Sequence, residues 1–256
     1  MGKQANRLTV GVLTPHAAPG PEVEIPMMAS ERLNVVVARI SRLDDDTVSQ
    51  PPSKAADLRT LATASAMRSA VESLREASVD VMAYASTTSG YAIGYAAEVS
   101  LVRQLGELAG VPVVSSGLAA TQALTAFGVR RVALIHPPWF EEEMTDLGAN
   151  YFRDREIDTV TLTATSLPKQ PELVRPEQVI GYVSNHVDDS TDAIFVAGNG
   201  FRAAQTIEEL EQRTGQLVLE ANQALLWSIL SATGSKLQIN GYGSLFRTAS
   251  PSPNSR

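Results

Sequence analysis

Short apolar runs recur along the chain, and polar or turn-forming residues separate them. Several runs are apolar throughout rather than alternating, which is typical of parallel strands that are covered on both faces. We therefore predict strands at residues 8–15, 79–86, 111–116, 130–137, 157–165, 192–200 and 216–221.

Longer segments with apolar residues at helical spacing lie between these runs. They cover residues 57–78, 96–110, 176–189 and 203–215, and two of them end in glycine, a common helix stop. Regular alternation of strands and helices predicts an α/β fold built on parallel sheets.

The second half of the chain repeats the pattern of the first. Asp80 opens the run DVMAYAS and Asp192 opens DAIFVAG, and each run is followed by a helical segment, a glycine and a short strand. The runs at 8–16 and 130–138 pair likewise, as the opening strand of each half. This repeat predicts two pseudo-symmetric, flavodoxin-like α/β lobes.

We assign residues 1–115 and about 229–256 to the first lobe and residues 116–228 to the second. The end of the chain, about 249–256, is predicted to be a flexible tail. In open parallel sheets, ligands bind beyond the carboxyl ends of the strands. Strand ends from two facing lobes would therefore enclose one pocket between them.

Composition and charge narrow the classes of function. The 256 residues carry a net charge of −7, which argues against nucleic acid and anionic membranes as partners, because both need clustered lysine and arginine. No apolar run approaches the roughly 20 residues that span a bilayer, and the N-terminus lacks the apolar core of a signal peptide. We expect a soluble, cytoplasmic protein.

The chain also lacks the usual ligands and nucleophiles of metal and thiol sites. It has no cysteine, which excludes disulfides and thiolate catalysis. Its histidines, His16, His136 and His186, are far apart in sequence and show no metal-ligand spacing. No metal site is predicted.

Five short motifs occur in a distinctive order and together span nearly the whole chain. They read GVLTPHAAPGPE, AYASTTSG, GVRRVALIHP, FVAGNGFR and ANQALLW. In combination they resemble the aspartate/glutamate racemase superfamily, in particular the branch that contains maleate cis–trans isomerase and arylmalonate decarboxylase. The resemblance implies a central pocket for a small carboxylate and cofactor-free chemistry through a carbanion or enediolate.

The sequence departs from this resemblance at both catalytic positions. Racemases of the superfamily use two cysteines that face each other across the pocket, and the matching positions here are Ser86 and Gly198. A serine hydroxyl needs an adjacent base, whereas a free cysteine is a few per cent thiolate at neutral pH. Gly198 can offer only its backbone. Two-base racemisation and thiol addition are therefore not inherited.

The positions that match the carboxylate-binding residues of the decarboxylase keep suitable donors. They are the hydroxyls of Thr87 and Thr88 after one strand and the backbone of Asn199 and Gly200 after another. Hydroxyl and N–H donors at strand ends can hold an oxyanion without lysine or arginine. Hydroxyl clusters such as 86–89 also cap helices, so a purely structural role stays open.

His16 follows Pro15, which matches the family's Thr-Pro pair, in a loop that should face the pocket. With an intrinsic pKa near ~6.5, His16 is the best substitute proton carrier beside Ser86. A solvent-exposed loop histidine is the alternative. Trp139 in the second lobe suggests a bulkier, more apolar pocket, although a core tryptophan fits the sequence equally well.

A rival interpretation comes from the stretch Gly198-x-Gly200-x-x-Ala203, which follows a predicted strand and opens a helix. Glu220 stands about 20 residues further on, as in the dinucleotide-binding fingerprint. The superfamily alignment explains both glycines, however, and the first lobe's equivalent stretch lacks them.

Three functions are consistent with these observations. The first is a cofactor-independent lyase or isomerase that acts on a small carboxylate through an enolate-type intermediate, without the usual cysteine pair. The second is a catalytically diverged carboxylate-binding protein, and the third is a dinucleotide-dependent oxidoreductase. A homo-oligomer, as a dimer or tetramer, is compatible with the two-lobed fold.

Overall fold

The computed structural model describes residues 7–30, 32–40, 54–164, 166–187 and 189–247. The strands are β1 Leu8–Thr14, β2 Leu33–Arg39, β3 Val81–Tyr84, β4 Val113–Ser115, β5 Arg131–His136, β6 Asp158–Thr163, β7 Ala193–Val196 and β8 Leu217–Glu220. The α-helices are α1 Pro21–Met28, α2 Ala55–Leu61, α3 Ala64–Glu76, α4 Thr87–Ile93, α5 Tyr95–Ala109, α6 Ser116–Ala126, α7 Glu142–Arg153, α8 Pro176–His186, α9 Ile207–Thr214 and α10 Ala221–Ala232. Three 3₁₀ turns are η1 Pro171–Leu173, η2 Ala204–Thr206 and η3 Ser244–Arg247.

The strands form two parallel four-stranded sheets with the same internal order. The first sheet has the order β2-β1-β3-β4, and the second has the order β6-β5-β7-β8. This is the strand order with which flavodoxin-like sheets begin. The structure therefore confirms the predicted α/β class with two pseudo-symmetric lobes.

Equivalent aspartates mark the repeat at the start of β3 and β7. Asp80 Oδ2 accepts a hydrogen bond from the Thr9 N–H at 2.7 Å, and Asp192 Oδ2 accepts from Arg130 and Arg131 N–H at 2.8 and 2.9 Å. Each carboxylate therefore accepts from backbone donors at the start of the neighbouring strand. The sequence repeat thus has the same structural role in both lobes.

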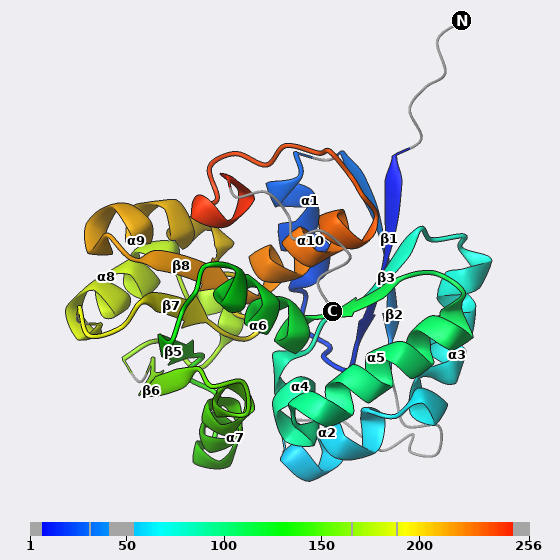
Figure 1. The fold of residues 1–256 in the computed structure, drawn as a ribbon, viewed down its shortest axis with the longest axis horizontal. Coiled ribbons are helices and arrows are strands. Elements are labelled where there is room, and N and C mark those ends of the chain that lie inside the picture. Colours follow the sequence, from blue (N-terminus) through cyan, green and yellow to red (C-terminus); the bar gives the residue numbers. More distant parts are fainter. Residues whose placement is uncertain (1–6, 31, 41–53, 165, 188, 248–256) are drawn as a thin grey trace, which may run out of the picture.

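Helices cover both faces of each sheet, and one helix in each lobe comes from the other half of the chain. One face of the first sheet packs on α3 and α5, and the other face packs on α1 and α10. In the second sheet, α8 and α9 cover one face, and α7 and α6 cover the other. The helices α6 and α10, which follow β4 and β8, are therefore exchanged between the lobes and lie side by side at the centre of the molecule (Figure 1).

Some elements differ from the sequence prediction. The strand β2 and the helices α1 and α7 were not predicted, although the valine run of β2 and the apolar spacing of α7 carry the usual signals. The predicted helix at 57–78 is broken, because Thr63 adopts an extended conformation and its hydroxyl caps α3 by accepting from the Ala66 N–H at 3.2 Å.

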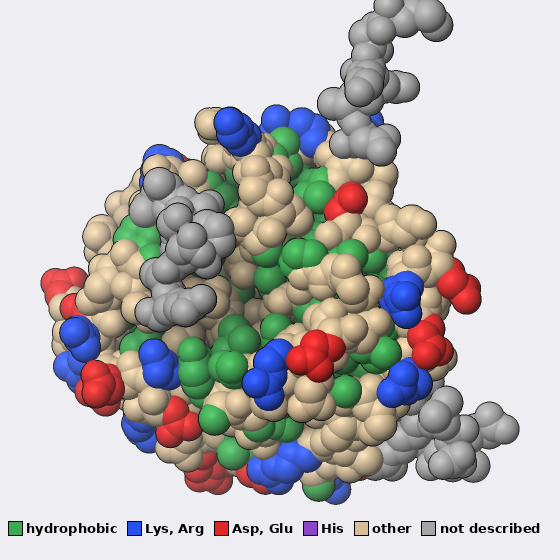
Figure 2. Space-filling model, turned by 45° about the vertical axis from the view of Figure 1, so that its right-hand side comes forward, with side chains coloured by type: hydrophobic (Ala, Val, Ile, Leu, Met, Phe, Trp, Pro, Cys, Tyr) green, Lys and Arg blue, Asp and Glu red, His purple; other side chains and the backbone are tan. Residues whose placement is uncertain are grey.

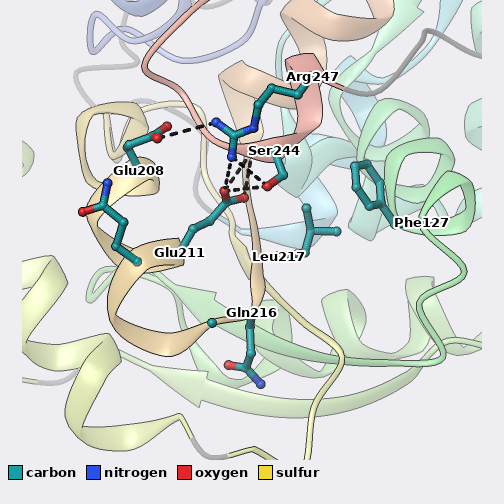
Figure 3. Close-up of a pocket in the computed structure, with 9 residues that line it drawn as sticks. Phe127, Glu208, Glu211, Gln216, Leu217, Ser244 and Arg247 are labelled. Carbon is teal, nitrogen blue, oxygen red and sulfur yellow. Dashed lines mark hydrogen bonds and ion pairs between the residues drawn. The ribbon is translucent and has the colours of Figure 1, made fainter.

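The segment after α10 contacts both lobes. Arg32, between α1 and β2, donates to the Gln238 carbonyl at 2.5 Å, and the chain then packs η3 against α9. Glu211 of α9 accepts from the N–H and hydroxyl of Ser244 and from the Arg247 guanidinium (Figure 3). The tail predicted at about 249–256 lies outside the described residues.

The surface and the helix lengths bear on possible partners. On the face shown in Figure 2, lysine and arginine side chains are interspersed with aspartate and glutamate and form no broad basic patch among the described residues. None of the helices in the described part of the chain is long and apolar enough to cross a membrane.

Candidate active site

Residues at the carboxyl ends of the two sheets meet between the lobes. The Thr87 N–H, just after β3, donates to Asn199 Oδ1, just after β7, at 3.1 Å. Gly20, in the loop after β1, lies so close to the Asn199 carbonyl that a Cβ there would come within 2.2 Å of its oxygen. The predicted meeting of strand ends across the lobe boundary is therefore present.

The hydroxyl cluster after β3 caps a helix. Ser86 is the N-cap residue of α4, and its Oγ accepts from the Ser89 N–H at 3.2 Å and lies 2.8 Å from Ser89 Oγ. This is the structural role expected for such a cluster. Capping does not account for the neighbouring histidine, which the same hydroxyl also contacts.

His16 lies directly above this cap. Its Nε2 is 2.9 Å from Ser86 Oγ and 3.1 Å from Thr88 Oγ1, and these two hydroxyls are 3.1 Å apart. Burial, and to a smaller extent the charge of the nearby Arg39 guanidinium, lower the pKa of His16 from its ordinary value to about 4. The imidazole is therefore neutral at pH 7 and can accept a proton.

A cavity of about 190 Å³ opens beside His16. The first lobe contributes His16, Ala17, Ala18, Leu58 and Thr88 to its lining, and the second contributes Trp139, Phe140, Glu141, Met144 and Pro171. One end is polar, at His16 and Thr88, and the opposite wall is mostly apolar. The volume is below the ~300–1,000 Å³ of sites for drug-sized ligands, so the cavity suits a small molecule.

The remaining predicted site residues lie behind or beside this cavity. Ser86 is fully buried behind His16 and Thr88, and Thr87 is buried, with its N–H engaged by Asn199. Pro15, Gly198, Asn199 and Gly200 are not among the described residues that line the cavity. The structure thus brings His16, Ser86, Thr87, Thr88 and Asn199 together, but only His16 and Thr88 face the cavity.

Gly198 cannot simply be replaced by the cysteine of the family pattern. Its φ of +93° lies in the region that favours glycine, and a Cβ would come 2.7 Å from Pro137 Cγ. The loop of residues 137–141 therefore occupies the space that a second catalytic side chain would need.

The acidic residue of the dinucleotide fingerprint is not available to a ribose. Glu220 is fully buried, and its Oε2 accepts from the N–H groups of Asn222 and Gln223 at 2.8 and 2.9 Å at the start of α10. Glu220 therefore acts as a helix cap, which is a structural explanation for its place in the sequence.

Two buried groups near the site had no functional interpretation from sequence. Glu98 of α5 is fully buried and accepts from the Tyr151 hydroxyl of α7 at 2.5 Å, and burial raises the pKa of its carboxyl to about 7. His136, at the end of β5, is fully buried and stacks on Phe140, and burial lowers its pKa to about 4. Neither ring nitrogen of His136 has a hydrogen-bond partner among the described residues.

Other candidate sites are weaker. The described residues contain no group of three or more His, Cys, Asp or Glu side chains that could hold a metal ion. A hollow of about 420 Å³ lies between α9 and η3, but its Glu208, Glu211 and Arg247 are bonded to one another (Figure 3). The cavity at His16 is the site at which loops from both lobes meet.

The family model for arylmalonate decarboxylase matches residues 62–246. The chain belongs to the arylmalonate decarboxylase family. The match begins directly after α2 and ends within η3, and it includes the hydroxyl cluster, Asn199 and the part of the cavity lining from Thr88 to Pro171. Membership confirms the resemblance found in the sequence, and with it an enzyme class of the lyase or isomerase type. A search of curated proteins found no match.

Solved structures share the fold across nearly the whole chain. A crystal structure of arylmalonate decarboxylase is 17% identical, covering 94% of this chain and 100% of that chain with a TM-score of 0.75. A maleate isomerase from Pseudomonas putida S16, solved with maleate, is 21% identical, covering 94% and 98% with a TM-score of 0.78. These likenesses show the two-lobed fold.

A third neighbour was solved in a covalent state. A maleate cis–trans isomerase from Nocardia farcinica is 20% identical, covering 95% of this chain and 99% of that chain with a TM-score of 0.76, and was solved with a covalently bound succinylcysteine intermediate. The present chain has no cysteine and cannot form such an adduct.

Proposed function

We propose that the protein is a cofactor-independent lyase or isomerase that acts on a small carboxylate through an enolate-type intermediate, with His16 as the proton carrier. The observation that carries the proposal is the position of His16 Nε2, at the cavity and within hydrogen-bonding distance of both Ser86 Oγ and Thr88 Oγ1. Ser86 orients the ring from behind, and Thr88 faces the ligand.

The neutral imidazole can act as a base in either member of this reaction class. In exchange or racemisation, His16 would take the proton from the saturated carbon next to the carboxylate, and the electron pair would move into the carboxyl group as an enediolate until the proton returns. In a cis–trans isomerisation, His16 would take a proton from a water molecule whose oxygen adds to one alkene carbon; the electron pair of the double bond would move into the carboxyl group, the new single bond would rotate, and loss of hydroxide, which takes the proton back, would restore the alkene.

In a decarboxylation, the bond to one carboxylate would break, CO₂ would leave with the electron pair passing into the other carboxylate, and a water molecule hydrogen-bonded to His16 would give its proton to the carbon, with the remaining hydroxide combining with CO₂ as bicarbonate. A positioned acid or base of this kind typically contributes ~10²–10⁴-fold.

The lining supports a carboxylate with an apolar substituent. Thr88 can donate to a carboxylate oxygen, and Trp139, Phe140, Met144 and Leu58 offer apolar surface opposite. A donor aimed at a developing oxyanion in a partly dehydrated site lowers the barrier without a cation. Glu141 at the rim adds a negative charge that opposes ligands with a second anionic group.

The test is a conversion assay in D₂O with phenylmalonate, maleate and phenylacetate, followed by proton NMR. Loss of CO₂, cis–trans conversion or exchange of the α-proton for deuterium would each support the proposal. His16→Gln and Thr88→Val should reduce that conversion at least about 100-fold. His186→Gln serves as a matched control, because His186 lies on α8 and its ring stacks on Tyr182 away from the cavity lining.

A binding protein without turnover is the competing outcome. If carboxylates raise the melting temperature but none is converted or exchanged, the enzymatic proposal is overturned in favour of carboxylate binding. If NAD or FAD raises the melting temperature instead, the oxidoreductase alternative takes its place.

A further inference from the structure

A chain of buried polar side chains runs from α1 to the first turn of α4 across the lobe boundary. It consists of Glu24, Asn222 and Asn199 and ends at the Thr87 N–H, and each of these four residues is at most 4% exposed. Glu24 and Thr87 belong to the first half of the chain, and Asn199 and Asn222 to the second. None of the three side chains lines the cavity among the described residues.

The first link fixes the orientation of the Asn222 amide. Glu24 Oε1 accepts from the Ala204 N–H at 2.8 Å, and Glu24 Oε2 accepts from Asn222 Nδ2 at 2.6 Å. The other hydrogen of Asn222 Nδ2 goes to the Asn199 carbonyl at 2.9 Å. Burial raises the pKa of the Glu24 carboxyl, but the Asn199 backbone carbonyl accepts and cannot donate in any case, so the amide must turn its nitrogen toward that carbonyl and toward Glu24.

The second link passes this orientation to Asn199. Asn222 Oδ1 accepts from Asn199 Nδ2 at 2.7 Å, and Asn199 Nδ2 also donates to Ser116 Oγ at 3.0 Å. Both hydrogens of that amide are then used. Asn199 Oδ1 is left as an acceptor for the Thr87 N–H at 3.1 Å. The bonds that the three side chains accept and pass on therefore run in one direction, from the Thr87 donor to the Glu24 acceptor, and the additional bond from Asn222 to the Asn199 carbonyl holds the two asparagines together.

We propose that Glu24, Asn222 and Asn199 are positioning residues, forming a one-way hydrogen-bond relay that holds the first turn of α4, with Ser86 and Thr88, against His16. The inference rests on the proposed function for the role of His16 and Thr88 in turnover. The positioning of the first turn of α4 does not depend on the proposed function. Thr87 lies in sequence between Ser86 and Thr88, the two residues whose hydroxyls contact His16 Nε2. A reacting group displaced by even ~1 Å loses much of its effect, so the anchor of this turn bears on the rate.

The relay can be tested by reversing one link while leaving the fold intact. Asn222→Asp keeps the shape of the side chain but replaces the donating amide with an acceptor that faces Glu24 Oε2 and the Asn199 carbonyl. Gln223→Glu is the matched control, because Gln223 is equally buried on the same turn of α10 and its amide bonds Tyr242 and Glu220 rather than the relay. Glu24→Gln combined with Asn222→Asp restores a hydrogen bond at the first link with the roles exchanged. The amide introduced at position 24 then donates to the carboxylate introduced at position 222.

The readout is hydrogen–deuterium exchange of the amides of residues 87–90, measured by mass spectrometry on the full-length protein. We expect Asn222→Asp to speed this exchange at least 10-fold and Gln223→Glu to change it less than 2-fold. The double variant should return the exchange rate most of the way to that of the unmodified protein. On the substrate identified among phenylmalonate, maleate and phenylacetate, Asn222→Asp should lower kcat at least 10-fold and leave KM within about 3-fold.

The outcomes separate the relay from the proposed function. If Asn222→Asp speeds exchange no more than Gln223→Glu does, or if the double variant is no better than Asn222→Asp alone, the relay is overturned. If the exchange pattern appears but no carboxylate is converted by the unmodified protein, the relay stands and the proposed function fails.

Discussion

His16 Nε2 lies 2.9 Å from Ser86 Oγ, the position at which the superfamily places its first catalytic thiol. A histidine from the loop after β1 thereby meets a serine from the end of β3. Under the proposed function, this pair supplies the base, and the base comes from the loop after β1 rather than from the end of β3.

The first prediction concerns the pH dependence of turnover. A base must be neutral to work, and burial together with Arg39 lowers the pKa of His16 to about 4. We expect kcat/KM for the converted carboxylate to stay near its maximum as the pH falls from 7 to 5, and to decline as it passes through about 4. A steady-state pH profile will show this. A decline centred near ~6.5, the ordinary value for histidine, would contradict the assignment.

The second prediction compares the two lost thiol positions. Gly198→Cys should destabilise the protein by about 2–4 kcal/mol, because its φ is positive and its side chain would meet Pro137. Ser86→Cys, at an N-cap with room for a similar side chain, should cost only about 1–2 kcal/mol. Urea unfolding measures the free energy of unfolding of both variants. Equal decreases would contradict this prediction, because they would show that the loop of residues 137–141 moves at little cost to make room for the new side chain.

The third prediction concerns the buried pair Glu98 and Tyr151. Burial raises the pKa of the Glu98 carboxyl from its ordinary value of 4.5 to about 7, so the folded protein holds this proton more tightly than the unfolded chain does. The stability that this proton provides is present below pH 4.5 and is lost as the pH rises through 7. Glu98→Gln should therefore gain roughly 3 kcal/mol relative to the unmodified protein between pH 4.5 and 8.

Chemical denaturation of both proteins at pH 5 and pH 8 gives this difference directly. Other titrating groups are shared by the two proteins and largely cancel. A stability difference that does not change with pH would mean that Glu98 is ionised throughout this range.

The fourth prediction concerns the attachment of η3. Glu211 accepts from Val218 and Ser244 N–H groups, from the Ser244 hydroxyl and from Arg247, with a side chain only 10% exposed. Glu211→Ala should cost about 2–4 kcal/mol in the free energy of unfolding. Glu209→Ala, which breaks an exposed pair with Arg213 on the same helix, should cost about 0.5 kcal/mol.

The fifth prediction concerns selectivity at the rim of the cavity. Glu141 is an exposed carboxylate in the lining, so a dianion should meet mild repulsion there. Glu141→Gln should lower KM for phenylmalonate about 2–5-fold and leave KM for the monocarboxylate phenylacetate unchanged. Isothermal titration can replace KM for a ligand that is bound but not converted. An equal change for both ligands would place the effect elsewhere.

The architecture could be predicted from the sequence because strand and helix signals repeat in both halves. Continuous apolar runs such as VDVMAYAS indicated parallel strands, and the aspartates at 80 and 192 marked the repeat. The break at Thr63 could not be predicted from periodicity, because the apolar spacing continues through it. The hydrogen bond from the Ala66 N–H to the Thr63 hydroxyl determines where α3 begins. The lobe boundary expected at residue 116 already assigned α6 to the second lobe, whereas the packing of α10 on the first sheet could not be predicted, since apolar spacing does not say which sheet a helix covers.

The candidate site was predictable in part. The positions of His16 and Thr88 after predicted strands indicated that they would lie at the pocket, and both side chains face the cavity. The inter-lobe contacts of Asn199 with Asn222 and Glu24 were not predicted, because they join positions that are far apart in sequence and have no local pattern. Glu141, Met144 and Pro171 were missed for the same reason, since a cavity wall depends on tertiary packing rather than on motif.

The exchange of α6 and α10 has a consequence for how the two lobes unfold. Neither half of the chain covers its own sheet completely, because one helix of each core is supplied by the other half. Unfolding of one lobe would therefore expose apolar surface of the other, and this couples the two lobes into one cooperative unit.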